Sequence, residues 1–188
     1  RRVLIVYTGG TIGMRRTERG FAPAPGQLES AMRAMPHFQD PSQGPRITPF
    51  SPYGQRIRYD IVEDDPLMDS SNMDMDDWVR IAHQIEHHYD NYDGFVILHG
   101  TDTMAFTASA LSFALKHLTK PVVFTGSQVP LASIRSDARR NLINSIEIAT
   151  SNLQEVVICF NDHVYRGNRA TKLSIGDFDA FGSPNLPP

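Results

Sequence analysis

The stretch formed by residues 3–7 and the turn Thr8-Gly9-Gly10-Thr11 constrains the fold more than any other part of the chain. The run at 3–7 is apolar and predicts a buried strand, and the two glycines permit a sharp turn with the backbone close to a ligand. Ligands of open α/β sheets bind beyond the carboxyl ends of the strands. The Thr11 hydroxyl is therefore expected at a binding or catalytic site.

Three later apolar runs end in the same way. Each run has the length of a strand and is followed at once by glycine or by polar residues, so the four ends together favour a cleft along one edge of a sheet over four unrelated polar loops. The three later ends are residues 95–98 before His99-Gly100-Thr101-Asp102-Thr103, residues 122–124 before Thr125-Gly126-Ser127, and residues 156–160 before Asn161-Asp162.

Helical patterns separate these runs. Residues 73–89 are the clearest case, because Trp78, Ile81, Ala82, Ile85 and Tyr89 repeat at helical spacing, with Asn72 or Asp74 available as a cap. Strands that alternate with helices predict an α/β fold with a mostly parallel sheet covered on both faces. Further helices are expected at 27–35, 105–118 and about 137–150, a half-buried strand at 56–62, and a loop at 13–23.

Composition excludes several classes of function. The net charge of −3 provides no basic field for a nucleic-acid partner. No apolar run approaches the roughly 20 residues that a membrane-spanning helix needs. The single cysteine, Cys159, lies in an apolar run and cannot form an internal disulfide, so we expect a buried thiol and a reducing, cytoplasmic setting.

Four motifs carry a family resemblance. TGGTIG at 8–13 and HGTDTM at 99–104 are similar to the paired threonine signatures of bacterial-type L-asparaginases. The segments PLMDSSNM at 66–73 and RGNRATK at 166–172 resemble the type I, cytoplasmic branch. The resemblance extends over nearly the whole chain. It implies a flavodoxin-like α/β domain that hydrolyses L-asparagine to L-aspartate and ammonia, with no cofactor and no metal.

The resemblance also assigns roles to particular side chains. Thr11 matches the primary nucleophile, whose hydroxyl is weak until a base or a nearby cation activates it. Thr101, Asp102 and Lys172 match a second triad, in which Thr101 holds the attacking water and Lys172 relays a proton. Backbone N–H groups at the turn that contains Gly100 could stabilise the developing oxyanion.

A zwitterionic amino acid needs groups that bind each of its charges. Ser70 and Ser71 suit its α-carboxylate, and Asp102, with Asp69 as a further candidate, suits its α-ammonium group. Ser127 stands where the family offers a backbone carbonyl to the leaving amide. Any one of these serines, taken alone, is more often a turn or cap residue than a binding residue.

One position departs from the family pattern. Bacterial members usually carry a tyrosine ten residues after the nucleophile, and this chain has Phe21 there. A phenylalanine can neither donate, accept nor relay a proton. The first triad is therefore incomplete in this sequence. Either another hydroxyl takes the place of the tyrosine, or the loop closes over the site for its shape alone, or the activity is reduced.

A second motif points to different chemistry. His83-Gln84-Ile85-Glu86-His87 fits the H-x-x-E-H pattern of inverted zinc peptidases. The helical period, however, places His83 and His87 opposite the apolar stripe, so that they face solvent rather than a cleft. We therefore interpret the motif as a solvated helix face.

The resemblance places this chain in a larger protein. Residues 1–188 correspond to the N-terminal catalytic domain of asparaginases, and residues 183–188 read as a linker before a smaller C-terminal domain that this chain lacks. The two-domain form is expected to be a homodimer or homotetramer. Two alternatives stay open: an asparaginase-like subunit of a tRNA-dependent amidotransferase, and a non-catalytic amino-acid-binding domain.

Overall fold

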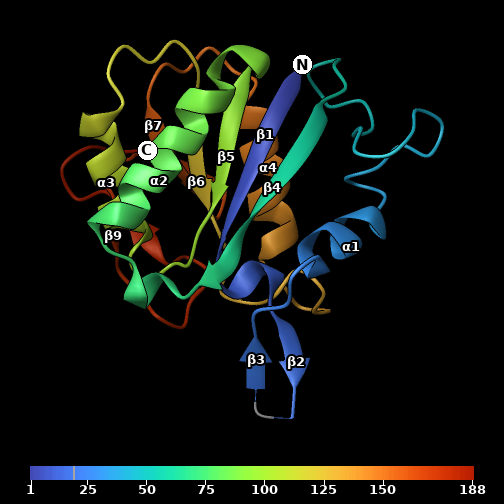
Figure 1. The fold of residues 1–188 in the computed structure, drawn as a ribbon, viewed down its shortest axis with the longest axis horizontal. Helices are drawn as coiled ribbons and strands as arrows, with labels where there is room; N and C mark the ends of the chain where they lie inside the picture. The colour runs from blue at the N-terminus through green and yellow to red at the C-terminus, as the bar shows by residue number, and fades with distance from the viewer. Residues whose placement is uncertain (19) are drawn as a thin grey trace.

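The computed structural model describes residues 1–18 and 20–188 and centres on one six-stranded sheet (Figure 1). Its strand order is β4-β1-β5-β6-β7-β8, and every neighbouring pair is parallel except the antiparallel pair β7 and β8. The mostly parallel α/β sheet predicted from the sequence is confirmed. The strands are β1 (Arg2–Gly9), β4 (Arg58–Met68), β5 (Gly94–Leu98), β6 (Val122–Thr125), β7 (Val156–Phe160) and β8 (His163–Arg166).

Helices cover both faces of the sheet. α1 (Gln27–Arg33) and α4 (Ala138–Ile148) pack on one face, and α2 (Met75–His88) and α3 (Met104–Ala114) pack on the other. Because side chains alternate along a strand, Ile5 of β1 enters the first core and Leu4 the second. Each aliphatic side chain buried in this way contributes about 1.5–3 kcal/mol to stability, so the strand ends stand on a rigid frame.

The ends of the helices follow local side-chain chemistry. α2 begins after Asp74, whose carboxylate accepts the N–H of Asp76 at 2.9 Å, while the Asp77 carboxylate accepts the N–H of Asp74 at 3.0 Å. This reciprocal capping box decides between the two predicted caps in favour of Asp74. α3 ends at Ala114, earlier than predicted, because the next residue, Leu115, is extended.

The prediction of a plain loop at 13–23 is wrong. β2 (Arg15–Thr17) and β3 (Gly20–Ala22) pair antiparallel as a small hairpin that projects from the body of the molecule (Figure 1). The Thr17 hydroxyl donates to the Gly20 carbonyl at 2.8 Å, and Gly20 has φ 110°, which favours glycine. Each strand of the hairpin is too short to show a periodic pattern in the sequence.

Short elements complete the chain. The 3₁₀ helices are η1 (Thr11–Gly13), η2 (Ser70–Asn72) and η3 (Tyr89–Asn91), and β9 (Thr171–Lys172) pairs antiparallel with β10 (Phe181–Gly182). Cys159 is buried in β7, so the predicted buried thiol is confirmed, and burial raises the pKa of this thiol to about 11.

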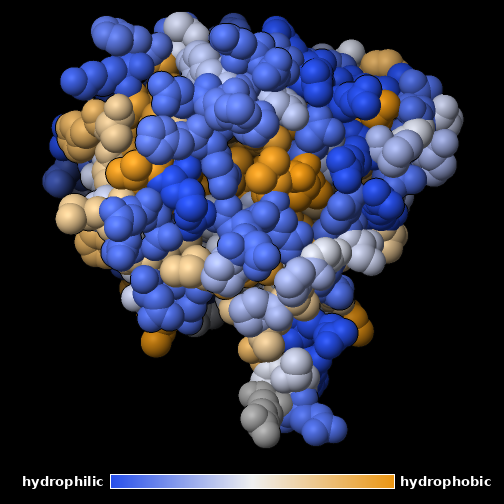
Figure 2. Space-filling view, viewed as in Figure 1, coloured by the Kyte–Doolittle hydropathy of each residue, from blue (hydrophilic) through white to orange (hydrophobic). Residues whose placement is uncertain are grey.

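The surface shown in Figure 2 is mainly hydrophilic, with apolar side chains in separate patches. Among the helices of residues 1–18 and 20–188, none combines the length and the apolar character needed to cross a membrane.

Candidate active site

The turns after β1 and β5 lie directly against each other. A Cβ added to Gly10 would stand 2.6 Å from the Gly100 Cα, and one added to Gly100 would stand 2.5 Å from the Ser70 Oγ. Gly10 also donates its N–H to the Met68 carbonyl at 3.3 Å. Only glycine fits these contacts, so the glycines bring three motif segments, distant in sequence, to one edge of the sheet.

Lys172 connects two of the predicted side chains. Its Nζ donates to the Thr101 Oγ1 at 2.8 Å and to the Asp102 Oδ1 at 2.7 Å. The Lys172 side chain is 12% exposed, whereas that of Asp102 is 59% exposed. The ammonium is thus largely withdrawn from water and held by a carboxylate that solvent can reach. The structure therefore brings together all three members of the predicted second triad.

Gln128 is a further member of this cluster that the sequence analysis missed. Its Oε1 accepts the Thr101 hydroxyl at 3.2 Å, which leaves an oxygen lone pair of Thr101 facing the Lys172 ammonium. The amide nitrogen of Gln128 donates to the Asp177 carbonyl at 3.1 Å. The only sequence signal was its position, directly after the strand end that contains Ser127.

A buried carboxylate fixes the loop that carries Gln128. Asp137 accepts the backbone N–H groups of Gln128 at 3.0 Å and Val129 at 3.1 Å. Burial raises the pKa of Asp137 above its usual range, although these N–H donors counteract part of the rise. The Ser127 hydroxyl donates to the Val129 carbonyl at 2.7 Å, so its proton is already engaged within the loop.

The segment with the two predicted serines forms η2 beside the Gly100 turn. Ser70 is buried, and its carbonyl accepts the Thr103 hydroxyl at 2.8 Å. Asp69 is exposed and accepts the Ser71 N–H at 3.0 Å, which caps η2. Ser71 is exposed, so it is the serine of this pair whose hydroxyl can face solvent. The predicted binding residues are therefore adjacent to the triad but differ in access.

Thr11 lies at the start of η1, half-buried at the same sheet edge. Within the described part of the chain, no hydrogen bond reaches its hydroxyl. The Tyr7 side chain packs against this turn. Its hydroxyl donates to the Gly10 carbonyl at 3.4 Å, and a Cβ added to Gly13 would stand only 2.3 Å from that hydroxyl oxygen. Burial, and then the nearby Glu63, raises the pKa of Tyr7 far above its usual range, so this phenol stays protonated.

Comparison with known proteins decides the family. A family model described as "Asparaginase, N-terminal" matches residues 2–188. The chain belongs to the asparaginase family. It is 52% identical to L-asparaginase 1 of Escherichia coli K12 over 99% of its own length and 52% of that protein's. It is 46% identical to the mouse 60 kDa lysophospholipase, over the whole of this chain and 35% of the mouse protein.

A solved relative has the same fold. The crystal structure of L-asparaginase I from Vibrio cholerae matches this asparaginase-family chain with a TM-score of 0.85 and 48% identity. The match covers 100% of this chain and 52% of the Vibrio chain. The chain thus spans about half the length of the Escherichia coli and Vibrio cholerae proteins.

Phe21 lies on β3 of the projecting hairpin and is 52% exposed. Its partner across the hairpin is Arg16. The unusual residue of this asparaginase-family chain is therefore at its surface and outside the core.

The outward orientation predicted for the two histidines of α2 is confirmed. His83 and His87 are both exposed, and the Nδ1 of His83 lies 3.3 Å from the Glu86 carboxylate. Among residues 1–18 and 20–188, no group of three or more His, Cys, Asp and Glu side chains is arranged to hold a metal ion.

Proposed function

We propose that this chain forms the N-terminal half of an enzyme that hydrolyses L-asparagine to L-aspartate and ammonia. The observation that carries the proposal is the contact of the Lys172 Nζ with both Thr101 and Asp102, at a sheet edge shared with the turn that bears Thr11. A half-buried hydroxyl, a sequestered ammonium and a carboxylate provide a nucleophile and a proton path without a metal.

Two steps account for the reaction. The Thr11 Oγ attacks the side-chain amide carbon while its hydroxyl proton passes to the amide nitrogen, through Lys172 and water or through groups beyond this chain. The C–N bond then breaks and ammonia leaves. Water held at Thr101 then attacks the resulting ester, which releases L-aspartate and restores the threonine hydroxyl. In this proposal Lys172 supplies and recovers protons, and Asp102 stabilises its charged form. Backbone N–H groups of the glycine turns stabilise the oxyanion in both steps.

The amino-acid end of the substrate is assigned to the exposed groups of the same edge. Ser71 and nearby backbone N–H groups receive the α-carboxylate, and Asp102, with Asp69, receives the α-ammonium group. Ser70 supports this segment from its buried position, and the Ser127 carbonyl faces the leaving amide.

We further propose that a smaller C-terminal domain and a partner subunit complete the pocket in a cytoplasmic homodimer or homotetramer. The exposed positions of Asp102, Asp69 and Ser71 on strand-end loops support this view, because sites of this kind are often closed by a neighbouring domain. The 188-residue chain by itself should fold but release ammonia slowly.

The test measures ammonia release from L-asparagine by the chain alone and by the two-domain form, with L-glutamine for comparison. Turnover by the two-domain form that greatly exceeds that of the single domain supports the proposal. Calorimetric binding of L-asparagine without any ammonia release would instead identify a non-catalytic amino-acid-binding domain.

One observation favours ester hydrolysis as a second candidate. A cavity of about 490 Å³ is lined by Asp102 and Lys172 together with the exposed apolar side chains Phe106, Leu173 and Ile175. A relative named as a lysophospholipase makes an acyl chain a reasonable occupant of this cavity. Release of fatty acid from lysophosphatidylcholine, abolished by Lys172→Met, would establish this activity, and no release would exclude it.

A further inference from the structure

Two carboxylates stand at the two ends of the predicted substrate-binding segment. Asp64 lies in β4 just before residues 65–76, and Asp77 lies in the first turn of α2 just after them. Residues 69–71, assigned above to the amino-acid end of the substrate, lie between the two. The conformation of this excursion therefore depends on how its ends are held.

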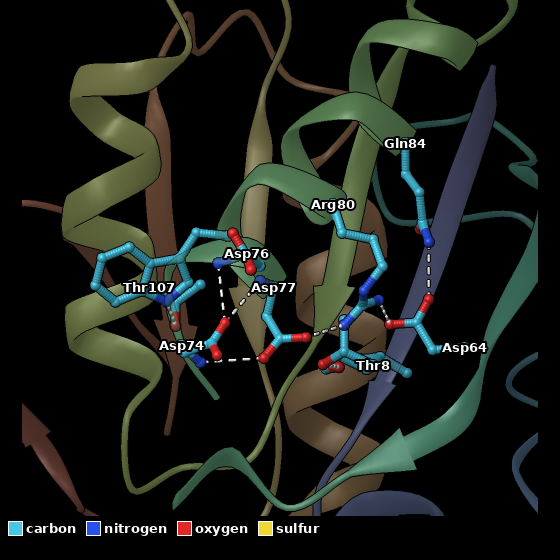
Figure 3. A network of polar contacts seen from close by, with 10 residues as sticks. Thr8, Asp64, Asp74, Asp76, Asp77, Arg80, Gln84 and Thr107 are labelled. Atoms are coloured by element: carbon cyan, nitrogen blue, oxygen red, sulfur yellow. Dashed lines mark hydrogen bonds and ion pairs between the residues drawn. The ribbon is translucent and has the colours of Figure 1, made fainter. Parts of the chain in front are cut away.

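The Arg80 side chain joins the two ends (Figure 3). Its Nη2 donates to the Asp77 Oδ1 at 2.7 Å, and its Nη1 forms a short ion pair with the Asp64 Oδ2. Gln84, one turn further along α2, donates to the other Asp64 oxygen at 2.7 Å. The Asp64 side chain is only 5% exposed, so both of its oxygens are committed to α2.

The hydrogen bonds between β4 and β1 do not by themselves hold the Asp64 end of this segment. β1 pairs Tyr7 with Glu63 and Gly9 with Met68, so residues 64–67 bulge out of the register. Such a bulge redirects the chain and leaves residues unpaired. The Arg80 and Gln84 contacts supply the missing attachment, and the Asp77 carboxylate transmits it to the N–H of Asp74.

We propose that Arg80 is a positioning residue, whose guanidinium clamps Asp64 to Asp77 and thereby sets the affinity of segment 69–71 for the amino-acid end of the substrate. The inference rests on the proposed function. Both Nη atoms of Arg80 donate to these two carboxylates, so we expect Arg80 to act through the segment and not by touching the substrate. A clamp of this kind strengthens the binding of the ground state and of the transition state alike. Its loss should therefore raise KM more than it lowers kcat.

The experiment is steady-state kinetics of the two-domain enzyme. Arg80→Met should raise the KM for L-asparagine and the Ki for L-aspartate about tenfold, with kcat within about twofold of the original. Arg80→Lys keeps one positive charge but cannot span both carboxylates, so its KM should lie between that of the unsubstituted enzyme and that of Arg80→Met. Arg33→Met, which removes a more exposed ion pair with Glu29 on α1, is the control for loss of a surface arginine and should leave KM unchanged.

A second variant separates positioning from stability. Arg80→Met leaves a buried carboxylate unpaired, which lowers stability by itself. The double variant Arg80→Met with Asp64→Asn removes that charge and should recover the melting temperature while KM stays high. Recovery of KM together with the melting temperature would overturn the clamp, as would an unchanged KM in Arg80→Met.

Amide hydrogen exchange tests the clamp independently of turnover. The N–H groups of residues 69–74 should exchange faster in Arg80→Met than in the unsubstituted protein and in Arg33→Met. Unchanged exchange in this segment refutes the clamp, whether or not the protein hydrolyses asparagine. An inactive unsubstituted enzyme with faster exchange in Arg80→Met would instead refute the proposed function and support the attachment.

Discussion

The two threonine turns at the sheet edge have the same local design but different degrees of completion. Each follows a buried parallel strand, and each places a threonine directly after a glycine. Thr101 is held on two sides, by Lys172 at 2.8 Å and by Gln128 at 3.2 Å. Thr11 has no side-chain hydrogen bond within the described residues, and the chain after it leaves the body as the hairpin β2–β3.

The difference extends to the residue before each glycine. His99 precedes Gly100 and is fully buried, whereas Gly9 precedes Gly10 at a point where a Cβ would lie 2.0 Å from the Met68 carbonyl. The position before Gly100 can therefore carry a side chain that packs in the core, whereas the position before Gly10 cannot. We propose that the described residues contain the proton-relay half of the site, built around Thr101. The nucleophile half, at Thr11, then needs a further proton path, either through Lys172 and water or from groups beyond this chain.

The largest expected effect comes from the less complete turn. Thr11→Val in the two-domain enzyme should lower kcat by about 10⁴-fold or more, because it removes the proposed nucleophile and not an accessory group. Thr11→Ser keeps a hydroxyl and should retain measurable turnover. Near-native ammonia release by Thr11→Val would contradict the assignment of Thr11 and identify Thr101 as the candidate nucleophile.

The next effect probes the completed turn. Lys172→Met should lower kcat by about 10²–10⁴-fold, the usual range for a positioned acid–base group. Asp102 is largely exposed, so the lost ion pair should change the melting temperature little. Lys116→Met provides a control away from the site. If kcat falls less than tenfold, the contacts of Lys172 are structural only.

Much of this architecture could be predicted from the sequence, for identifiable physical reasons. Buried parallel strands are continuous apolar runs, so β1, β5, β6 and β7 are visible without any structure, and the glycine turns mark their ends. The amphipathic stripe revealed α2. The motif resemblance grouped Thr101, Asp102 and Lys172, but only the folded chain shows that one ammonium contacts the other two.

Other features depend on contacts that no local pattern records. The hairpin β2–β3 and the pair β9–β10 have strands of two or three residues, too short for a period. Gln128 reaches Thr101 only because Asp137, nine residues later, fixes its backbone. Arg80 meets Asp64 across sixteen residues of sequence. Such pairings are set by tertiary geometry, and composition and spacing leave them undetermined.

The third prediction concerns the stiffened turn and its pH dependence. Burial lowers the pKa of His99 to about 4, although the Gly100 carbonyl, which accepts from Nδ1 at 2.7 Å, and then Asp77 favour the charged form. Between about pH 4 and 6.5 the unfolded chain binds a proton at this histidine and the folded chain does not. Stability therefore falls as pH falls through this window, by about 3 kcal/mol in total.

Urea unfolding between pH 7 and pH 4 measures this effect. The loss of unfolding free energy should be about 3 kcal/mol smaller in His99→Gln, which keeps a donor but cannot be protonated in this range. His83→Gln is the control, because His83 is exposed and should leave the pH dependence unchanged. Equal slopes for His99→Gln and the unsubstituted protein would show that His99 is charged in both states.

The smallest expected effect is at Phe21, and it decides whether the nucleophile half is deficient or completed elsewhere. The resemblance to bacterial-type asparaginases implies a tyrosine at this position, and here a half-exposed phenylalanine on the hairpin provides no hydroxyl. If nothing replaced that hydroxyl, Phe21→Tyr would restore a positioned acid–base group and raise kcat by about 10²–10⁴-fold.

We expect the opposite, a change of less than tenfold in kcat, equivalent to under about 1.4 kcal/mol of barrier. The cluster at Thr101 is fully assembled, and it could act only in an enzyme whose Thr11 is also active. We therefore expect the proton path for Thr11 to run through Lys172 and water or through groups beyond this chain. Phe21→Leu is the matched control for bulk, since it also lacks a hydroxyl. The measurement is kcat and KM of the two-domain enzyme for all three side chains. A gain of tenfold or more, confined to tyrosine, would mean that the Thr11 half is deficient in this protein and not completed by other groups.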